Sequence, residues 1–163
     1  MNKATIRIAI QSALVALAAY MAGSHFTDLL HAETSRIGAV WSLVTGIVVL
    51  QATPHETFKS GVLRLVGTLI GAIIGACYLS MFSFSLPGMA ISVGVTVLLC
   101  QIAGVPDNGR LAAITVVIVL AVSAAMPTLS PVANAALRFG ESFIGAVIAM
   151  TTVLLWPKAG DAA

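Results

Sequence analysis

The sequence predicts an all-α integral membrane protein whose six transmembrane helices form two inverted three-helix repeats. Three observations lead to this fold class. The chain of 163 residues is 59% hydrophobic and only 9% charged, with a mean hydropathy of +1.04, whereas soluble domains carry about 25% charged residues. Six apolar runs follow one another with short links, and two separate blocks of sequence recur 74 positions later. No soluble domain is expected within this sequence.

The first half of the chain is expected to contain three spans, because a transmembrane helix needs about 20 predominantly apolar residues. These spans run approximately over residues 6–23, 37–51 and 61–81. The stretch 25–33, which mixes both signs of charge, is expected to form a short interfacial turn of helix. The polar stretch 55–59 is expected to be a link.

The second half is expected to contain the other three spans, at about 89–103, 111–126 and 130–156. An uncharged link at 83–88 combines serines and a proline, which suits a turn followed by the first turn of a helix. Pro-Asp-Asn-Gly at 106–109 is a compact turn signal. Ser-Pro just before the last apolar run indicates an N-cap and the first residue of the final helix.

The first span resembles a secretory signal peptide in one respect, because Lys3 and Arg7 precede its apolar run. The repeat described below needs this helix, so we expect it to be retained. Basic residues near span ends then predict that both termini are cytoplasmic. On this orientation the cytoplasmic side holds six basic residues and the opposite side two: Lys3, Arg7, Lys59, Arg64, Arg110 and Lys158 against Arg36 and Arg138.

Two blocks of sequence recur at one common separation. Arg64-Leu-Val-Gly-Thr-Leu-Ile-Gly is echoed 74 positions later by Arg138-Phe-Gly-Glu-Ser-Phe-Ile-Gly. The same separation relates Arg36-Ile-Gly-Ala-Val to Arg110-Leu-Ala-Ala-Ile. A unit with an odd number of spans re-enters the membrane in the opposite direction, so the two halves are expected to be inverted repeats. Many secondary transporters build their site at the interface of such repeats.

The repeat also defines the expected domain organisation. We expect one transmembrane domain over residues 1–163, with repeat one at about 1–82 and repeat two at about 83–157. A short C-terminal tail at 158–163 follows.

Small residues gather on one face of the third span. On a helix that turns about 100° per residue, Arg64, Thr68, Gly71 and Gly75 share a face, and Gly67 lies beside them. Glycines at this spacing allow membrane helices to approach closely. We therefore expect these glycines to serve helix packing, as does Gly145 in the last span.

The two arginines of the repeated block are the main candidates for a functional site. Arg64 is expected three to six residues into its span, a depth of about 5–9 Å from which an arginine can snorkel to the interface. Anchoring and a role in a substrate pathway are therefore both open. The position of Arg64 on the small-residue face favours a pathway, because intramembrane charges that face a bundle interior usually line one. The same reasoning applies to Arg138.

Three polar neighbours complete the candidate pathway. Glu141 is one turn from Arg138 and is expected either to neutralise it locally or to couple transport to protons. Thr68 and Ser142 follow the two arginines at the same distance and are weaker candidates for contact with an anion.

Other kinds of site are not indicated. The chain has no nucleophile–base pairing, phosphate-binding loop or basic patch, so we expect neither an enzyme nor a nucleic-acid partner. Cys77 and Cys100 lie inside apolar runs, and the three histidines lie in different links. We therefore expect no metal site, no disulfide and no cofactor.

A stretch of about forty residues resembles the membrane unit of the fusaric acid resistance (FUSC) and aromatic acid exporter superfamily. The resemblance is carried by Val40-Trp41 through Gln51, then Pro54, Thr57 and Gly61, then Arg64-x-x-Gly67-Thr68-x-x-Gly71. It implies six helices in two three-helix repeats, and export of aromatic or other organic carboxylic acids across the bacterial inner membrane. Arg64 and Arg138 would attract the carboxylate.

The resemblance also implies partners. Larger members carry two such units with a cytoplasmic domain, and some work with a periplasmic adaptor. The present sequence has one unit, so we expect a homodimer in the lipid bilayer, and the missing domain puts adaptor coupling in question. The plant aluminium-activated malate channels, distantly similar, are dimers of six-helix units in which basic residues attract anions. An anion channel is therefore the alternative to an exporter, and a non-transporting membrane subunit of a larger efflux complex is a third hypothesis.

Overall fold

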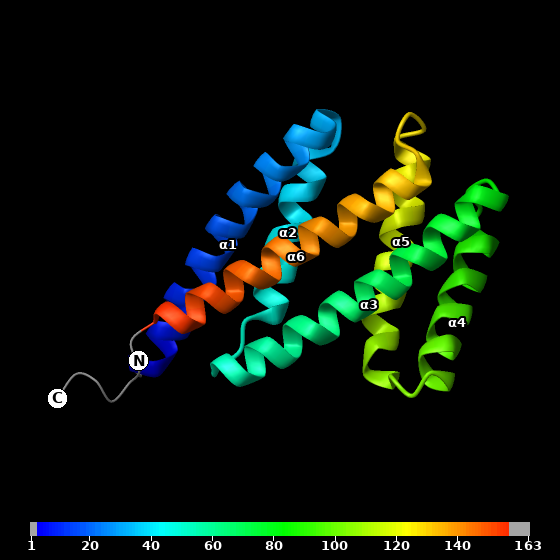
Figure 1. The fold of residues 1–163 in the computed structure, drawn as a ribbon. Coiled ribbons are helices and arrows are strands. Elements are labelled where there is room, and N and C mark those ends of the chain that lie inside the picture. The colour runs from blue at the N-terminus through cyan, green and yellow to red at the C-terminus, as the bar shows by residue number, and fades with distance from the viewer. Residues whose placement is uncertain (1–2, 157–163) are drawn as a thin grey trace. The chain divides into compact units, whose positions relative to one another are not determined.

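The computed structural model describes residues 3–156, and every regular element in that range is helical (Figure 1). The predicted C-terminal tail and Lys158 lie outside the described residues. Two short 3-10 helices occur, η1 at Ala32–Thr34 and η2 at Pro106–Asn108. The six α-helices are α1 (Lys3–His31), α2 (Ser35–Val49), α3 (Pro54–Met81), α4 (Leu86–Ile102), α5 (Gly109–Ala125) and α6 (Pro131–Leu155).

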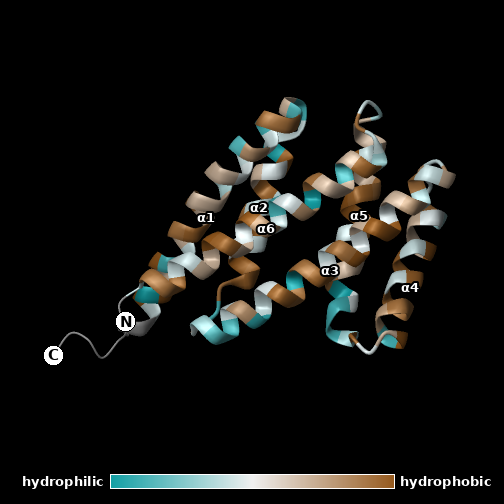
Figure 2. Cartoon of the chain, in the orientation of Figure 1, coloured by the Kyte–Doolittle hydropathy of each residue, from teal (hydrophilic) through white to brown (hydrophobic). Residues whose placement is uncertain are grey.

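Four helical segments of the described chain are long and apolar enough to cross a membrane. They are Thr5–Val49, Pro54–Met81, Pro106–Ala125 and Pro131–Leu155. The first of them comprises most of α1 together with η1 and α2, and α4 is a shorter apolar helix of 17 residues. Large apolar side chains are exposed on all six α-helices, and Figure 2 shows hydrophobic residues along most of their length. The prediction of an all-α, multi-pass membrane protein is confirmed.

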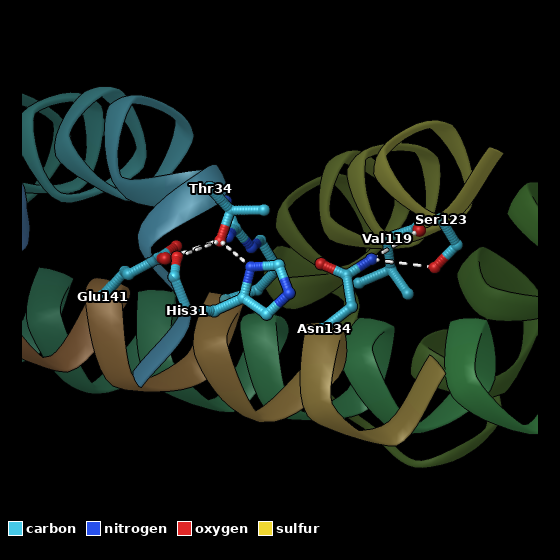
Figure 3. A network of polar contacts seen from close by, with 7 residues as sticks. His31, Thr34, Val119, Ser123, Asn134 and Glu141 are labelled. Carbon is cyan, nitrogen blue, oxygen red and sulfur yellow. Dashed lines mark hydrogen bonds and ion pairs between the residues drawn. The ribbon is translucent and has the colours of Figure 1, made fainter. Parts of the chain in front are cut away.

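The first helix is longer than the sequence predicted. A span ending near residue 23 and a separate turn of helix were expected, but α1 continues without a break to His31. No glycine or proline occurs between residues 24 and 31, so nothing in the backbone stops the helix there. It ends where the Thr34 hydroxyl donates a hydrogen bond of 3.1 Å to the carbonyl oxygen of His31, beside the His31 ring (Figure 3).

The third helix starts earlier than predicted. The polar stretch 55–59 was expected to be a link, but it forms the first turns of α3. Thr53 caps the helix, because its hydroxyl oxygen accepts from the Glu56 backbone N–H at 3.2 Å and its hydroxyl donates to Glu56 Oε2 at 2.9 Å. Pro54 is the first helical residue, where its missing N–H costs nothing. Thr-x-x-Glu is therefore a helix start rather than the end of a link.

The boundaries of the later helices follow local hydrogen-bonding signals. Ser85 caps α4 by accepting from the Gly88 N–H at 3.2 Å, and Ser130 caps α6 by accepting from the Ala133 N–H at 3.2 Å. Both caps agree with the sequence prediction. The end of α4 has Gly104 at φ 72°, with the Val105 N–H bonded to the Cys100 carbonyl at 2.9 Å. Glycine adopts this left-handed conformation without steric cost, which terminates the helix.

The chain forms two compact units. The first contains the residues up to Gly61 and those from Phe143 onward, and the second contains Val62–Ser142. Helices α3 and α6 therefore contribute a segment to each unit. In the first unit α1 lies along α2, around a core that includes Val49 and Ala149. In the second unit α4 lies along α5.

Candidate functional site

The glycine face of α3 packs against α5 in the second unit. A Cβ atom on Gly71 would collide with the carbonyl oxygen of Ala112 and would lie 2.8 Å from the Thr115 Cβ. A Cβ on Gly67 would meet Leu111 at 2.8 Å, and one on Gly75 would meet a methyl group of Val119 at 2.9 Å. Because real Cβ atoms do not approach so closely, the three glycines allow backbone-to-backbone packing of these helices.

Arg64 lies on the same face and is 2% exposed. The sequence placed it three to six residues into a span, but α3 begins at Pro54, ten residues earlier. At 1.5 Å per residue, Arg64 is about 15 Å from the start of the helix. It is thus a buried residue near the middle of α3, and the shallow depth predicted from the sequence is wrong.

Arg138 and Glu141 form a buried ion pair on α6. Arg138 Nη2 lies 2.9 Å from Glu141 Oε1, and both side chains are 0% exposed. The local pairing expected from their spacing is therefore present. A charge-assisted contact of this length is strong once both groups are out of water, and it holds the Arg138 side chain in one position.

The two arginine-bearing helices meet at Thr68 and Ser142. The Thr68 hydroxyl donates to the Ser142 hydroxyl oxygen at 3.4 Å, and both residues are 0% exposed. These residues are 74 positions apart, which is the separation of the repeat. Arg64 precedes Thr68 by one turn, as Arg138 precedes Ser142. Four of the five predicted pathway residues thus flank or form one buried contact in the second unit, and the fifth, Glu141, binds Arg138.

The buried charges of this region do not cancel. Arg64, Arg138 and Glu141 are the only buried charged residues of the part of the chain that the structure describes. Two cations and one anion leave an excess of one positive charge. A low-dielectric interior makes this excess attractive to a single negative charge.

Asn134 extends the polar row on α6 and was missed by the sequence analysis. It lies one turn before Arg138 and is 0% exposed. Its amide nitrogen donates to the Val119 carbonyl and to the Ser123 hydroxyl, both at 2.9 Å, which ties α6 to α5 (Figure 3). Its amide oxygen is buried without a hydrogen-bond partner. The signal was available: an asparagine within an apolar run, on the same face as Arg138.

Gly145 makes the corresponding close approach in the first unit. A Cβ there would collide with the carbonyl oxygen of Ser42 and would lie 2.9 Å from the Gly46 nitrogen and 3.0 Å from the Thr45 Cβ. The C-terminal part of α6 therefore packs on α2 as closely as α3 packs on α5.

Residues 13–152 match the family described as fusaric acid resistance protein-like. The chain belongs to the fusaric acid resistance protein-like family. Membership of this family indicates membrane transport or efflux rather than catalysis. The resemblance found in the sequence is thereby confirmed. No curated protein and no solved structure matches the chain.

Proposed function

We propose that this member of the family is a homodimeric transporter of the bacterial inner membrane that exports small organic, chiefly aromatic, carboxylates. The observation that carries the proposal is the pair of buried arginines, Arg64 and Arg138, on either side of the Thr68–Ser142 contact. A buried guanidinium is costly in a membrane protein and usually serves a substrate or ion pathway. An excess of one positive charge suits a substrate that carries one carboxylate.

The same proposal includes six spans in two inverted repeats, and the Thr68–Ser142 contact supports it. Residues related by a two-fold axis touch each other only where the axis passes between them. Thr68 and Ser142 occupy equivalent positions of the repeated block, and they are hydrogen-bonded. Their helices also run in opposite directions at this point, as Figure 1 shows, which is what an inverted pair requires.

Helix packing within each unit gives a second line of support. Gly71 and Gly145, which are equivalent in the repeat, each approach the backbone of a helix of the other half. Gly71 meets Ala112 and Thr115, whereas Gly145 meets Ser42 and Thr45. Both pairs of contacts relate α2 to α5 at a separation of 70 positions.

This separation differs from the 74 that was inferred from Arg36 and Arg110. Four residues are close to one helical turn, so either alignment keeps the same face of the helix. At 70 positions, Val-Thr-Gly-Ile-Val-Val-Leu at 44–50 aligns with Ile-Thr-Val-Val-Ile-Val-Leu at 114–120. The repeat is therefore better described with a shift of one turn between its second and third helices.

Under this proposal the two arginines lie on opposite sides of the contact. Each precedes the contact by four residues on helices of opposite direction, so each is about 6 Å from it along its own helix. Arg64 would face the cytoplasmic half of the pathway and Arg138 the other half. A carboxylate could then pass from one arginine to the next.

Flux measurements in proteoliposomes test the proposal. Purified protein should move 4-hydroxybenzoate or fusarate with saturating kinetics and in response to a proton gradient. Large voltage-dependent anion currents with little selectivity would instead favour the channel alternative. Absence of flux under every gradient would leave a membrane subunit of a larger efflux complex, with a periplasmic adaptor as its expected partner.

The homodimer needs a separate measurement. The proposal rests on the single six-helix unit, where larger members of the superfamily have two. The mass of the protein in a detergent micelle, determined by light scattering, should equal two chains. A mass of one chain at all protein concentrations would contradict a stable homodimer.

A further inference from the structure

A cavity of about 320 Å³ lies in the first unit, where the first turns of α1 face the end of α2. Its volume falls within the range of small-molecule sites. Its polar lining consists of Arg7, Gln11, Ser12 and Gln51, and its apolar lining includes Ile8 and Leu50. None of these residues belongs to the buried arginine site described above.

Local structure brings this lining together. Arg7 and Gln11 are one turn apart on α1, so both side chains lie on one face of the helix. Helix α2 stops at Val49 because Leu50 is extended, with φ −61° and ψ 120°. The next residue, Gln51, is held by its backbone N–H, which donates to the hydroxyl oxygen of the buried Thr57 at 3.0 Å. The far wall of the cavity is thus fixed to the start of α3.

Gln11 is the observation that points to a ligand. Its side chain is only 6% exposed, yet its amide makes no hydrogen bond to any described residue, and it borders the cavity. Burying an amide without a partner is unfavourable, so this group requires a polar atom inside the cavity. Arg7, one turn away, is half-buried and forms no ion pair with the residues that the structure describes.

We propose that this cavity binds an oxyanion attached to an apolar body. Arg7 supplies the positive charge and a pair of parallel N–H donors, which match the two oxygens of a carboxylate. Gln11 and Ser12 donate further hydrogen bonds, and Ile8 and Leu50 contact the apolar part of the ligand. An aromatic carboxylate has this chemistry, and so does the head group of an anionic lipid.

A cavity in the second unit provides a contrast. It measures about 360 Å³ and is polar through Ser80, Ser83 and Ser123, but no charged residue lines it. A serine-lined cavity can hold water or a neutral group, whereas only the Arg7 cavity offers a charge to an anion. The role of the Arg7 cavity as a docking site for the exported carboxylate rests on the proposed function, but its ability to bind an oxyanion does not.

Calorimetric titration of the full chain with 4-hydroxybenzoate tests the proposal. The protein is held in nanodiscs of zwitterionic lipid, so that no anionic head group competes. We expect saturable binding that weakens about tenfold in R7Q, because a charge-assisted contact is lost, and that also weakens in Q11L. The matched control is R36Q, which removes an exposed arginine of the same unit and should bind like the unaltered protein.

A second arm identifies a lipid as the occupant. In nanodiscs that contain phosphatidylglycerol, a lipid site would retain that lipid after delipidation, in the unaltered protein and in R36Q but not in R7Q, as measured by native mass spectrometry. Arg7-dependent binding in either arm supports the oxyanion site. If R7Q, R36Q and the unaltered protein behave alike in both arms, the proposal is overturned.

Failure of the proposed function has a different signature. Protein that binds 4-hydroxybenzoate through Arg7 but transports none of it would contradict the exporter and leave the oxyanion site intact. Protein that transports the compound with equal apparent affinity in R7Q and R36Q, and shows no Arg7-dependent binding, would contradict only the site.

Discussion

The three buried charged residues are the most demanding feature at the scale of single residues. Arg64, Arg138 and Glu141 each give up hydration, and only the contact between Arg138 and Glu141 is short enough to be an ion pair at 2.9 Å. Removing one partner of a buried pair leaves a charge without compensation, which costs about 3–5 kcal/mol. Such residues are expensive for stability alone, and this expense supports a role in transport.

The ion pair on α6 gives the first prediction. R138Q and E141Q should each lower the unfolding free energy by about 3 kcal/mol, whereas R138Q/E141Q should be more stable than the sum of the two losses implies. The pair of glutamines carries no charge, so nothing buried is left uncompensated. Thermal unfolding in detergent measures the double-mutant cycle. Losses that simply add up would mean that the two side chains do not stabilise each other.

Sequence reasoning found the charged residues of the site but not its neutral ones. Arginines and a glutamate inside apolar runs are conspicuous, whereas Asn134 and Gln11 are single amides whose importance depends on what packs around them. The depth of Arg64 was misjudged because the start of a helix and the start of an apolar run are different points. The capping residues at Thr53 and Glu56 marked the true start.

At the scale of helices, the sequence predicted the number and order of the six apolar segments well. The starts and ends of α2, α4 and α5 lie within about three residues of the predicted spans. The two large differences, at the end of α1 and the start of α3, have one cause. Hydropathy reports where the chain is apolar, but a helix continues through polar residues until a backbone signal ends it.

Close helix packing gives a second prediction. G71A should destabilise the protein by about 1–3 kcal/mol, because the added methyl group meets the backbone of α5 at Ala112. G94A is the matched control, since nothing lies within 4 Å of a Cβ at that exposed helical position. It should unfold at the same temperature as the unaltered protein or slightly higher, because alanine favours a helix. Equal unfolding temperatures for G71A and G94A would contradict tight packing of α3 on α5.

At the scale of the whole molecule, the sequence revealed a repeat but not its register. The third helices of the two halves aligned correctly, because an arginine and a glycine mark both. The second helices are rich in valine, alanine and isoleucine, so alignments one turn apart look alike. Only the contacts of Gly71 and Gly145 distinguish a separation of 70 from one of 74.

The inverted topology predicts the side of the membrane on which each link lies. Single cysteines are introduced after Cys77 and Cys100 have been replaced by alanine, and whole cells are treated with a membrane-impermeant maleimide. We expect labelling from outside at three positions and labelling only after permeabilisation at two: E33C, S83C and T128C against H55C and D107C.

Two results would contradict this topology. Labelling of H55C and S83C from the same side would mean that α3 does not cross the membrane. Labelling of E33C only after permeabilisation would mean that α1 does not cross, and the count of six spans would then fail. Retained transport of each variant serves as the control that the protein is folded.

The central claim is that the buried arginines carry the carboxylate, and flux through R64A tests it most directly. Proteoliposomes with R64A should transport 4-hydroxybenzoate at least about tenfold more slowly than those with the unaltered protein, since a charge-assisted contact with the anion is lost. R36A, which removes an exposed arginine, should transport normally. Folding of R64A is verified by its elution as a single species and by its helical circular dichroism. Unchanged flux through folded R64A would contradict the claim and would leave Arg64 a structural residue.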